Sequence, residues 1–118
     1  MPRYLSMIRI NENDTPEGGP DERLMEDMGK LIDEMTKAGV LLDTAGLKPT
    51  AQGKRVHLSG GKLSTTDGPF TETKEVVGGY AMFQVKDQAE AVEWTRRFLA
   101  IHGDGWNISC EVREVDEP

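Results

Sequence analysis

Two segments with helical apolar spacing, separated by a long series of short strand-like runs, constrain the fold of this chain most. In Pro20 to Ala38, apolar residues recur every three or four positions and form one stripe from Leu24 to Met35. Asp87 to His102 repeats the pattern, and its first residues have the spacing of a capping box. The spacing therefore predicts two amphipathic helices, each with one face for a common core.

Strand-like runs fill the rest of the chain, and Gly60-Gly61 lies between two of them as a tight hairpin turn. The Gly78-Gly79 pair at the start of another run predicts a bulge or a close backbone approach. The runs are Arg3 to Ile10, Val40 to Leu47, Lys54 to Ser59, Lys62 to Thr66, Val76 to Lys86 and Asn107 to Val115. The order predicts an α+β, ferredoxin-like protomer with an inserted β-hairpin, in a single domain of residues 1–118.

Two helices can cover only one face of the predicted sheet. The other face would hold Leu5 and Met7, with Tyr80 and Met82 as further candidates. Such an apolar face is unfavourable in water, and a second copy of the chain is the simplest partner that could bury it. We therefore expect a homodimer that packs sheet against sheet.

Composition excludes several classes of function. The net charge of −7 opposes binding to a nucleic-acid backbone or an anionic membrane. A single cysteine rules out an intrachain disulfide, and the absence of an apolar leader predicts a cytoplasmic protein. The two histidines, His57 and His102, lack metal-site spacing, and phosphate-loop and dinucleotide motifs are missing, so we expect neither a metal nor a tightly bound cofactor.

The last predicted strand has Ser109, Glu111 and Arg113 on the face opposite its apolar residues. If the apolar set faces the helices, these polar side chains share the open face with Arg9 of the first strand. Charges inside a dimer interface must be paired or must meet a ligand. Arg9, Glu111 and Arg113 are therefore candidates for binding a small carboxylate or similar anion, and an Arg–Glu ion pair that fixes the dimer register is equally compatible.

The stretch from Asp67 to Glu75 offers two further candidate sites. Asp67 opens a Gly-Pro turn and could act as a general base if burial raises its pKa, although bonding to turn amides is the commoner role of such an aspartate. Thr71 to Glu75 could form one helical turn that binds an anion with help from Lys74. The alternative for this segment is a solvated charged face.

Several short motifs together give the chain a family resemblance. They are Asp67-Gly68-Pro69-Phe70, Thr71-Glu72-Thr73-Lys74-Glu75 and Gly78-Gly79-Tyr80, behind Ala38-Gly39-Val40 and Leu47-Lys48-Pro49-Thr50, with Glu111-Val112-Arg113 near the end. With these motifs the sequence resembles the DGPF subgroup of the YCII-related proteins. The resemblance implies a dimeric α/β-barrel of ferredoxin-like protomers. In the better-known branch of the family, an Asp with a His is the usual suggestion for the catalytic pair, and Asp67 and His102 are the corresponding candidates here.

Two functional hypotheses of different classes follow. In the first, the chain is a small enzyme with Asp67 as acid/base, and the residues that bind its polar or anionic substrate are Arg9, Glu111, Arg113, Lys74 and Tyr80. In the second, the same dimer is a non-catalytic binding or regulatory module in which the DGPF motif is structural. The resemblance leaves room for the second hypothesis, because some DGPF-type proteins are associated with alternative sigma factors.

Overall fold

The computed structural model describes residues 1–71 and 73–117 and has the predicted α+β architecture. Its elements are β1 (Arg3–Ile10), α1 (Glu22–Lys37), β2 (Leu41–Gly46), a 3-10 turn (Thr50–Gln52), β3 (Lys54–Ser59), β4 (Lys62–Asp67), β5 (Val76–Gln84), α2 (Gln88–Ala100) and β6 (Ile108–Glu114). Each predicted helix and strand is present, and its ends differ from the predicted ones by no more than a few residues.

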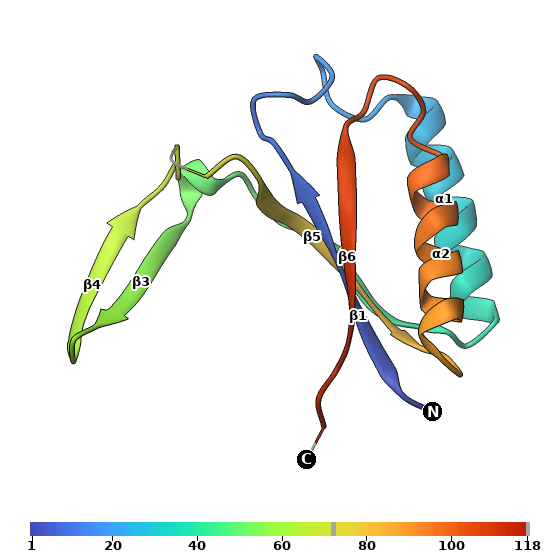
Figure 1. The fold of residues 1–118 in the computed structure, drawn as a ribbon. Helices are drawn as coiled ribbons and strands as arrows, with labels where there is room; N and C mark the ends of the chain where they lie inside the picture. Colours follow the sequence, from blue (N-terminus) through green and yellow to red (C-terminus); the bar gives the residue numbers. More distant parts are fainter. Residues whose placement is uncertain (72, 118) are drawn as a thin grey trace.

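The main sheet has the antiparallel order β2-β5-β1-β6, which is compatible with a ferredoxin-like fold. Both helices cover the same face of this sheet, as Figure 1 shows. The core lies between these two layers and includes Tyr4, Leu31, Met35, Val40, Phe83, Val85 and Ala91. Among the described residues, no helix lies on the opposite face of the sheet, so the predicted open face is present.

The helix ends follow from local hydrogen bonds that the sequence indicates. Asp87 Oδ1 accepts a bond of 2.9 Å from the Glu90 backbone N–H, and Glu90 Oε1 accepts one of 3.1 Å from the Lys86 N–H. These bonds satisfy amides at the start of α2 that have no partner inside the helix. The Arg97 guanidinium then pairs with both carboxylate oxygens of Glu34, at 2.5 and 2.8 Å, and thereby links α2 to α1.

Strand register determines which side chains share the open face, defined here by β1 residues Leu5, Met7 and Arg9 and their cross-strand partners. Leu5 pairs with Met82 of β5 and Arg113 of β6, and Met7 pairs with Tyr80 and Glu111. Directly paired residues point to the same side of an antiparallel sheet. The predicted grouping of the apolar residues with Glu111 and Arg113 is therefore confirmed.

The β3–β4 hairpin forms a sheet of its own and projects from the body on the side opposite the helices (Figure 1). The turn that follows it packs closely on the 3-10 turn. The Gly68 N–H donates to the Gly53 carbonyl at 2.9 Å, and a Cβ at Gly68 would lie 1.7 Å from the Thr50 carbonyl oxygen. The backbone of Thr50 thus occupies the space that a side chain at position 68 would need. Backbone atoms cannot move aside as the end of a flexible side chain could.

We predict that Gly68→Ala lowers the free energy of unfolding by about 1–3 kcal/mol, because the Thr50 backbone must shift to admit the methyl group. Gly29→Ala is the matched control, because Gly29 lies inside α1 and nothing surrounds its Cβ position within 4 Å. That control should gain about 0.5–1 kcal/mol from helix propensity. Urea unfolding measures both, and equal midpoints for the two variants would contradict the prediction.

Candidate functional site

A cleft of about 350 Å³ lies between the open face and the base of the β3–β4 hairpin. We call it the arginine cleft. Its charged lining residues are Arg9, Arg55, Glu75, Glu111 and Arg113, and its remaining walls are Met7, Thr50, Phe70, Val76 and Val77. Three of the predicted anion-binding residues, Arg9, Glu111 and Arg113, are therefore brought together in one cavity.

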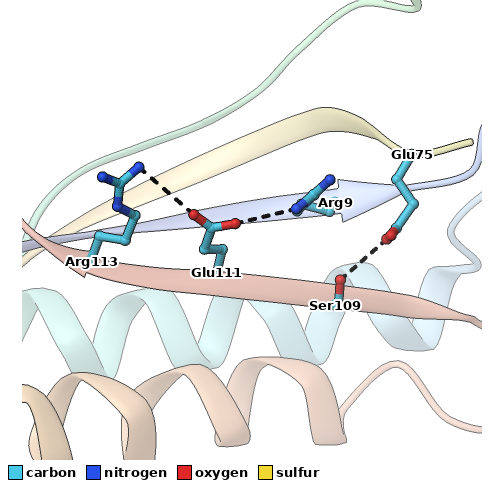
Figure 2. A network of polar contacts seen from close by, with 5 residues as sticks. All are labelled: Arg9, Glu75, Ser109, Glu111 and Arg113. Carbon is cyan, nitrogen blue, oxygen red and sulfur yellow. Dashed lines mark hydrogen bonds and ion pairs between the residues drawn. The ribbon is translucent and has the colours of Figure 1, made fainter. Parts of the chain in front are cut away.

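The charged side chains form the network drawn in Figure 2. Arg9 Nη1 donates to Glu111 Oε1 at 3.2 Å, while Arg113 Nη1 lies 3.8 Å from the second oxygen of the same carboxylate. The Arg9 and Glu111 side chains are each 42% exposed and that of Arg113 is 72% exposed. Ion pairs with this exposure contribute about 0–1 kcal/mol, so an incoming anion can compete for both guanidinium groups at low cost.

Glu75 completes the drawn network at the other end of the cleft. Ser109 Oγ donates to Glu75 Oε2 at 3.3 Å, which links β6 to the residue that precedes β5 (Figure 2). With this residue included, the cleft lining holds three arginines and two glutamates and so has a net charge of +1. The cleft is therefore locally basic in a chain whose net charge is −7.

Arg55 and Phe70 form the wall of the cleft on the hairpin side. The Arg55 guanidinium carbon lies 3.9 Å from the centroid of the Phe70 ring, and its Nη2 donates to Thr73 Oγ1 at 3.1 Å. A cation stacked on an aromatic ring is held in one orientation. Reasoning from the sequence missed both residues, because only the placement of the hairpin reveals that they reach the cleft.

A bulge in β5 lies next to Val77, one of the residues that line the cleft. Ile8 pairs with Gly79 but Arg9 pairs with Val77, so Gly78 is the extra residue. A Cβ at Gly78 would approach the Ile10 side chain to 2.8 Å, and one at Gly79 would approach the Ala45 carbonyl oxygen to 2.9 Å. The bulge and close approach predicted for this glycine pair are thus confirmed, and they occur beside Arg9.

Tyr80 lies on the open face, outside the lining of the arginine cleft. Its hydroxyl donates to Asp43 Oδ2 at 2.8 Å. This hydrogen bond and the negative charge of Asp43 favour the neutral phenol and raise the pKa of Tyr80 above its usual value near 10. Tyr80 can therefore offer an incoming molecule a neutral hydroxyl that is already oriented by a partner.

The candidate catalytic residues Asp67 and His102 occupy different layers of the protein. Asp67 ends β4, its side chain is 76% exposed, and its Oδ1 lies 2.5 Å from Lys54 Nζ. His102 follows α2, where its Nδ1 lies 3.0 Å from the Phe98 carbonyl oxygen and its ring packs between Phe98 and Trp106. The hairpin and α2 are on opposite sides of the sheet (Figure 1), and neither residue lines the arginine cleft.

Of the two alternatives for Thr71 to Glu75, the solvated charged face agrees with the described residues, because Lys74 and Glu75 are exposed, and Glu72 lies outside the described residues. Within this segment the Thr73 N–H donates to the Phe70 carbonyl at 3.2 Å. Lys74 is exposed and lines a separate cavity of about 110 Å³ near Glu12.

Groups suited to metal or nucleophilic chemistry are scarce in the described part of the chain. No group of three His, Cys, Asp or Glu side chains there is close enough to hold a metal ion. Burial raises the pKa of the Cys110 thiol and so disfavours the reactive thiolate. None of the helices among the described residues is long and apolar enough to cross a membrane.

The sheet order and the two helices on one face define a small α+β protein whose architecture is compatible with a ferredoxin-like fold. The chain belongs to the YCII-related family, since the model of the YCII-related domain matches residues 3–114. It is also 34% identical over 76 residues to an uncharacterized protein of Rhizobium meliloti (strain 1021). That alignment covers 64% of this chain and 61% of the relative.

We predict that Asp43→Asn lowers the pKa of Tyr80 toward its usual value near 10. The raised pKa implies that the Tyr80–Asp43 interaction stabilises the fold fully below about pH 10 and is lost as the pH rises through the folded-state pKa. Absorbance at 295 nm measures this ionisation. A Tyr4→Phe background leaves Tyr80 as the single tyrosine, since the chain has two.

Asp104→Asn is the control for that titration, because it removes an exposed carboxylate elsewhere on the chain. It should leave the ionisation of Tyr80 unchanged. If Asp43→Asn also left the midpoint where it is, the hydrogen bond would not be the cause of the raised pKa.

Proposed function

We propose that this YCII-related protein binds a small anionic metabolite, with a carboxylate as the preferred group, in the arginine cleft. The observation that supports this most is that Arg9 and Arg113 share one carboxylate, that of Glu111, in a partly exposed network. A ligand carboxylate can accept hydrogen bonds from both arginines, and charge-assisted bonds of this kind are among the stronger ones available to a protein. Met7 and Phe70 supply apolar walls for the rest of the ligand.

The binding or regulatory hypothesis fits the geometry better than the catalytic one. Catalysis by Asp67 with His102 stays a prediction, because these residues lie apart from each other and outside the arginine cleft. The acid/base groups that do line the cleft are Glu75 and Glu111, and each is already bonded to a neighbour. A dimeric ligand-binding protein, with a role such as that of a partner of an alternative sigma factor, requires no further chemistry in the cleft.

We also propose that the functional unit is a homodimer formed through the open face, giving the dimeric α/β-barrel, and that the chain belongs to the DGPF subgroup of its family. The half-exposed Leu5, Met7 and Met82 support the dimer, because their burial against a second copy would remove apolar surface from water. The lone Cys110 and the absence of any second cysteine favour a reducing, cytoplasmic location.

We predict that small monocarboxylates stabilise the protein against heat and that Arg9→Gln abolishes the effect. A ligand at one hundred times its dissociation constant adds about 2.7 kcal/mol. For a domain of this size, that raises the melting temperature by at least several degrees. Thermal shift with acetate, pyruvate and benzoate, against chloride at equal ionic strength, measures it.

Two further variants sharpen the thermal-shift experiment. Arg96→Gln removes an exposed arginine from α2, far from the cleft, and should respond to carboxylates as the unmodified protein does. Glu111→Gln removes the carboxylate that competes for Arg9 and Arg113, so it should bind the same probes more tightly. An identical response from all four proteins would overturn the proposed site.

We predict that Leu5→Glu converts the dimer to a monomer at micromolar concentration. A charge placed at the centre of the sheet-to-sheet interface would have to be buried without a partner, which is costly. Met25→Glu is the matched control, because Met25 is 60% exposed on α1, away from the open face. Sedimentation velocity compares the variants, and a Leu5→Glu protein that remains dimeric would exclude the open face as the interface.

A further inference from the structure

The β3–β4 hairpin carries an apolar strip that its own chain leaves in solvent. Val56, Leu58 and Leu63 are 70%, 72% and 75% exposed. Leu58 pairs directly with Leu63, and Val56 is two residues from Leu58, so all three side chains lie on one face of the hairpin. We call this face the hairpin strip.

In the described part of the chain, the contacts that attach the hairpin to the body lie at its base. It is a separate two-stranded sheet that projects from the body (Figure 1), and two-stranded hairpins alone are marginally stable in water. Its observed attachments are at the base, where Arg55 stacks on Phe70 and Gly68 packs on Thr50. An exposed apolar strip on such an element is a typical feature of a surface that another molecule covers.

We propose that the hairpin strip is covered by a second copy of this chain, so that each hairpin acts as an arm on its partner. This inference rests on the homodimer of the proposed function and adds an interface to it. The hairpin projects on the side of the sheet opposite the helices, which is the side of the open face (Figure 1). A copy that covers the open face therefore lies beside the arm.

Charge complementarity favours a second copy over other partners. Residues 54–67 contain three basic residues and one acidic residue, for a net charge of +2. The rest of the chain contains eleven basic and twenty acidic residues, for a net charge of −9. Each arm is thus attracted to the body of another copy and offsets part of the repulsion between two acidic bodies.

The test is the dissociation constant of the dimer, measured by sedimentation equilibrium, for the unmodified protein and for Leu58→Ser/Leu63→Ser. Loss of two buried leucine side chains should raise this constant by about tenfold or more. His57→Ser, on the opposite face of the same hairpin, and Met25→Ser, on α1, are the controls and should stay within about twofold of the unmodified protein.

The outcomes separate this inference from the proposed dimer. If the unmodified chain is a monomer, both are overturned. If it is a dimer that Leu5→Glu disrupts but Leu58→Ser/Leu63→Ser does not, the open-face dimer stands and the arm is overturned. The arm is also overturned if the double variant leaves the dimer intact but loses binding to a nucleic acid or to a different protein, because the strip then serves another partner.

A second measurement uses the unmodified protein and does not depend on whether the variant hairpin folds. Dimers are formed from one isotope-labelled and one unlabelled chain, and NMR detects contacts between methyl groups of the two chains. We expect such contacts from the methyl groups of Val56, Leu58 and Leu63. A dimer without intermolecular contacts from these three residues would overturn the arm.

Discussion

The packing of Gly68 on the Thr50 carbonyl is the contact on which the rest of the site depends. It leaves no room for a side chain, and the hydrogen bond from Gly68 to Gly53 fixes the direction in which the chain leaves β4. The 3-10 turn is itself anchored to the loop after β1, because the Thr50 N–H and hydroxyl both donate to the Glu12 carboxylate. Phe70, two residues after Gly68, is thereby placed at the cleft together with the Arg55 that stacks on it. The sequence alone could assign the Asp67-Gly68-Pro69-Phe70 motif to catalysis. In the structure its first role is to let the backbone after β4 pack directly against the backbone of the 3-10 turn.

The charged side chains of the cleft are only partly buried, so their ion pairs can rearrange. Glu111 holds Arg9 directly and Arg113 at a longer distance, and all three side chains keep contact with water. Complete burial of such a network would require every charge to be compensated, since an unpaired buried ion is strongly unfavourable. A sheet-to-sheet dimer would move this network toward that condition. A bound carboxylate would then supply the negative charge that two arginines and one glutamate lack.

Alternation along β1 and β6 was sufficient to predict that Arg9, Glu111 and Arg113 share one face of the sheet, because successive side chains of a strand point to opposite faces. The helices and hairpin were likewise predictable from apolar spacing, caps and glycines. Arg55 and Phe70 were not, since their position depends on a contact between Gly68 and Thr50, which are distant in sequence. For Thr71 to Glu75, local propensity left a helical turn and a solvated charged face as alternatives, and the exposed Lys74 and Glu75 agree with the second.

For the proposed anion site, the charges of the chain limit which anions the cleft would select. At an ionic strength of 0.1 M the Debye length is about 10 Å, so the net charge of −7 repels distant anions only weakly, and a ligand in the cleft interacts mainly with the charges within that distance. A lining of net charge +1 balances one negative charge, and each additional charge on a ligand would face Glu75 and Glu111 at close range. In the proposed site, an anion with a single carboxylate and an apolar body would match both the arginines and the walls formed by Met7 and Phe70. A multiply charged phosphate compound would leave charge uncompensated, so discrimination between the two follows from the two glutamates as much as from the arginines.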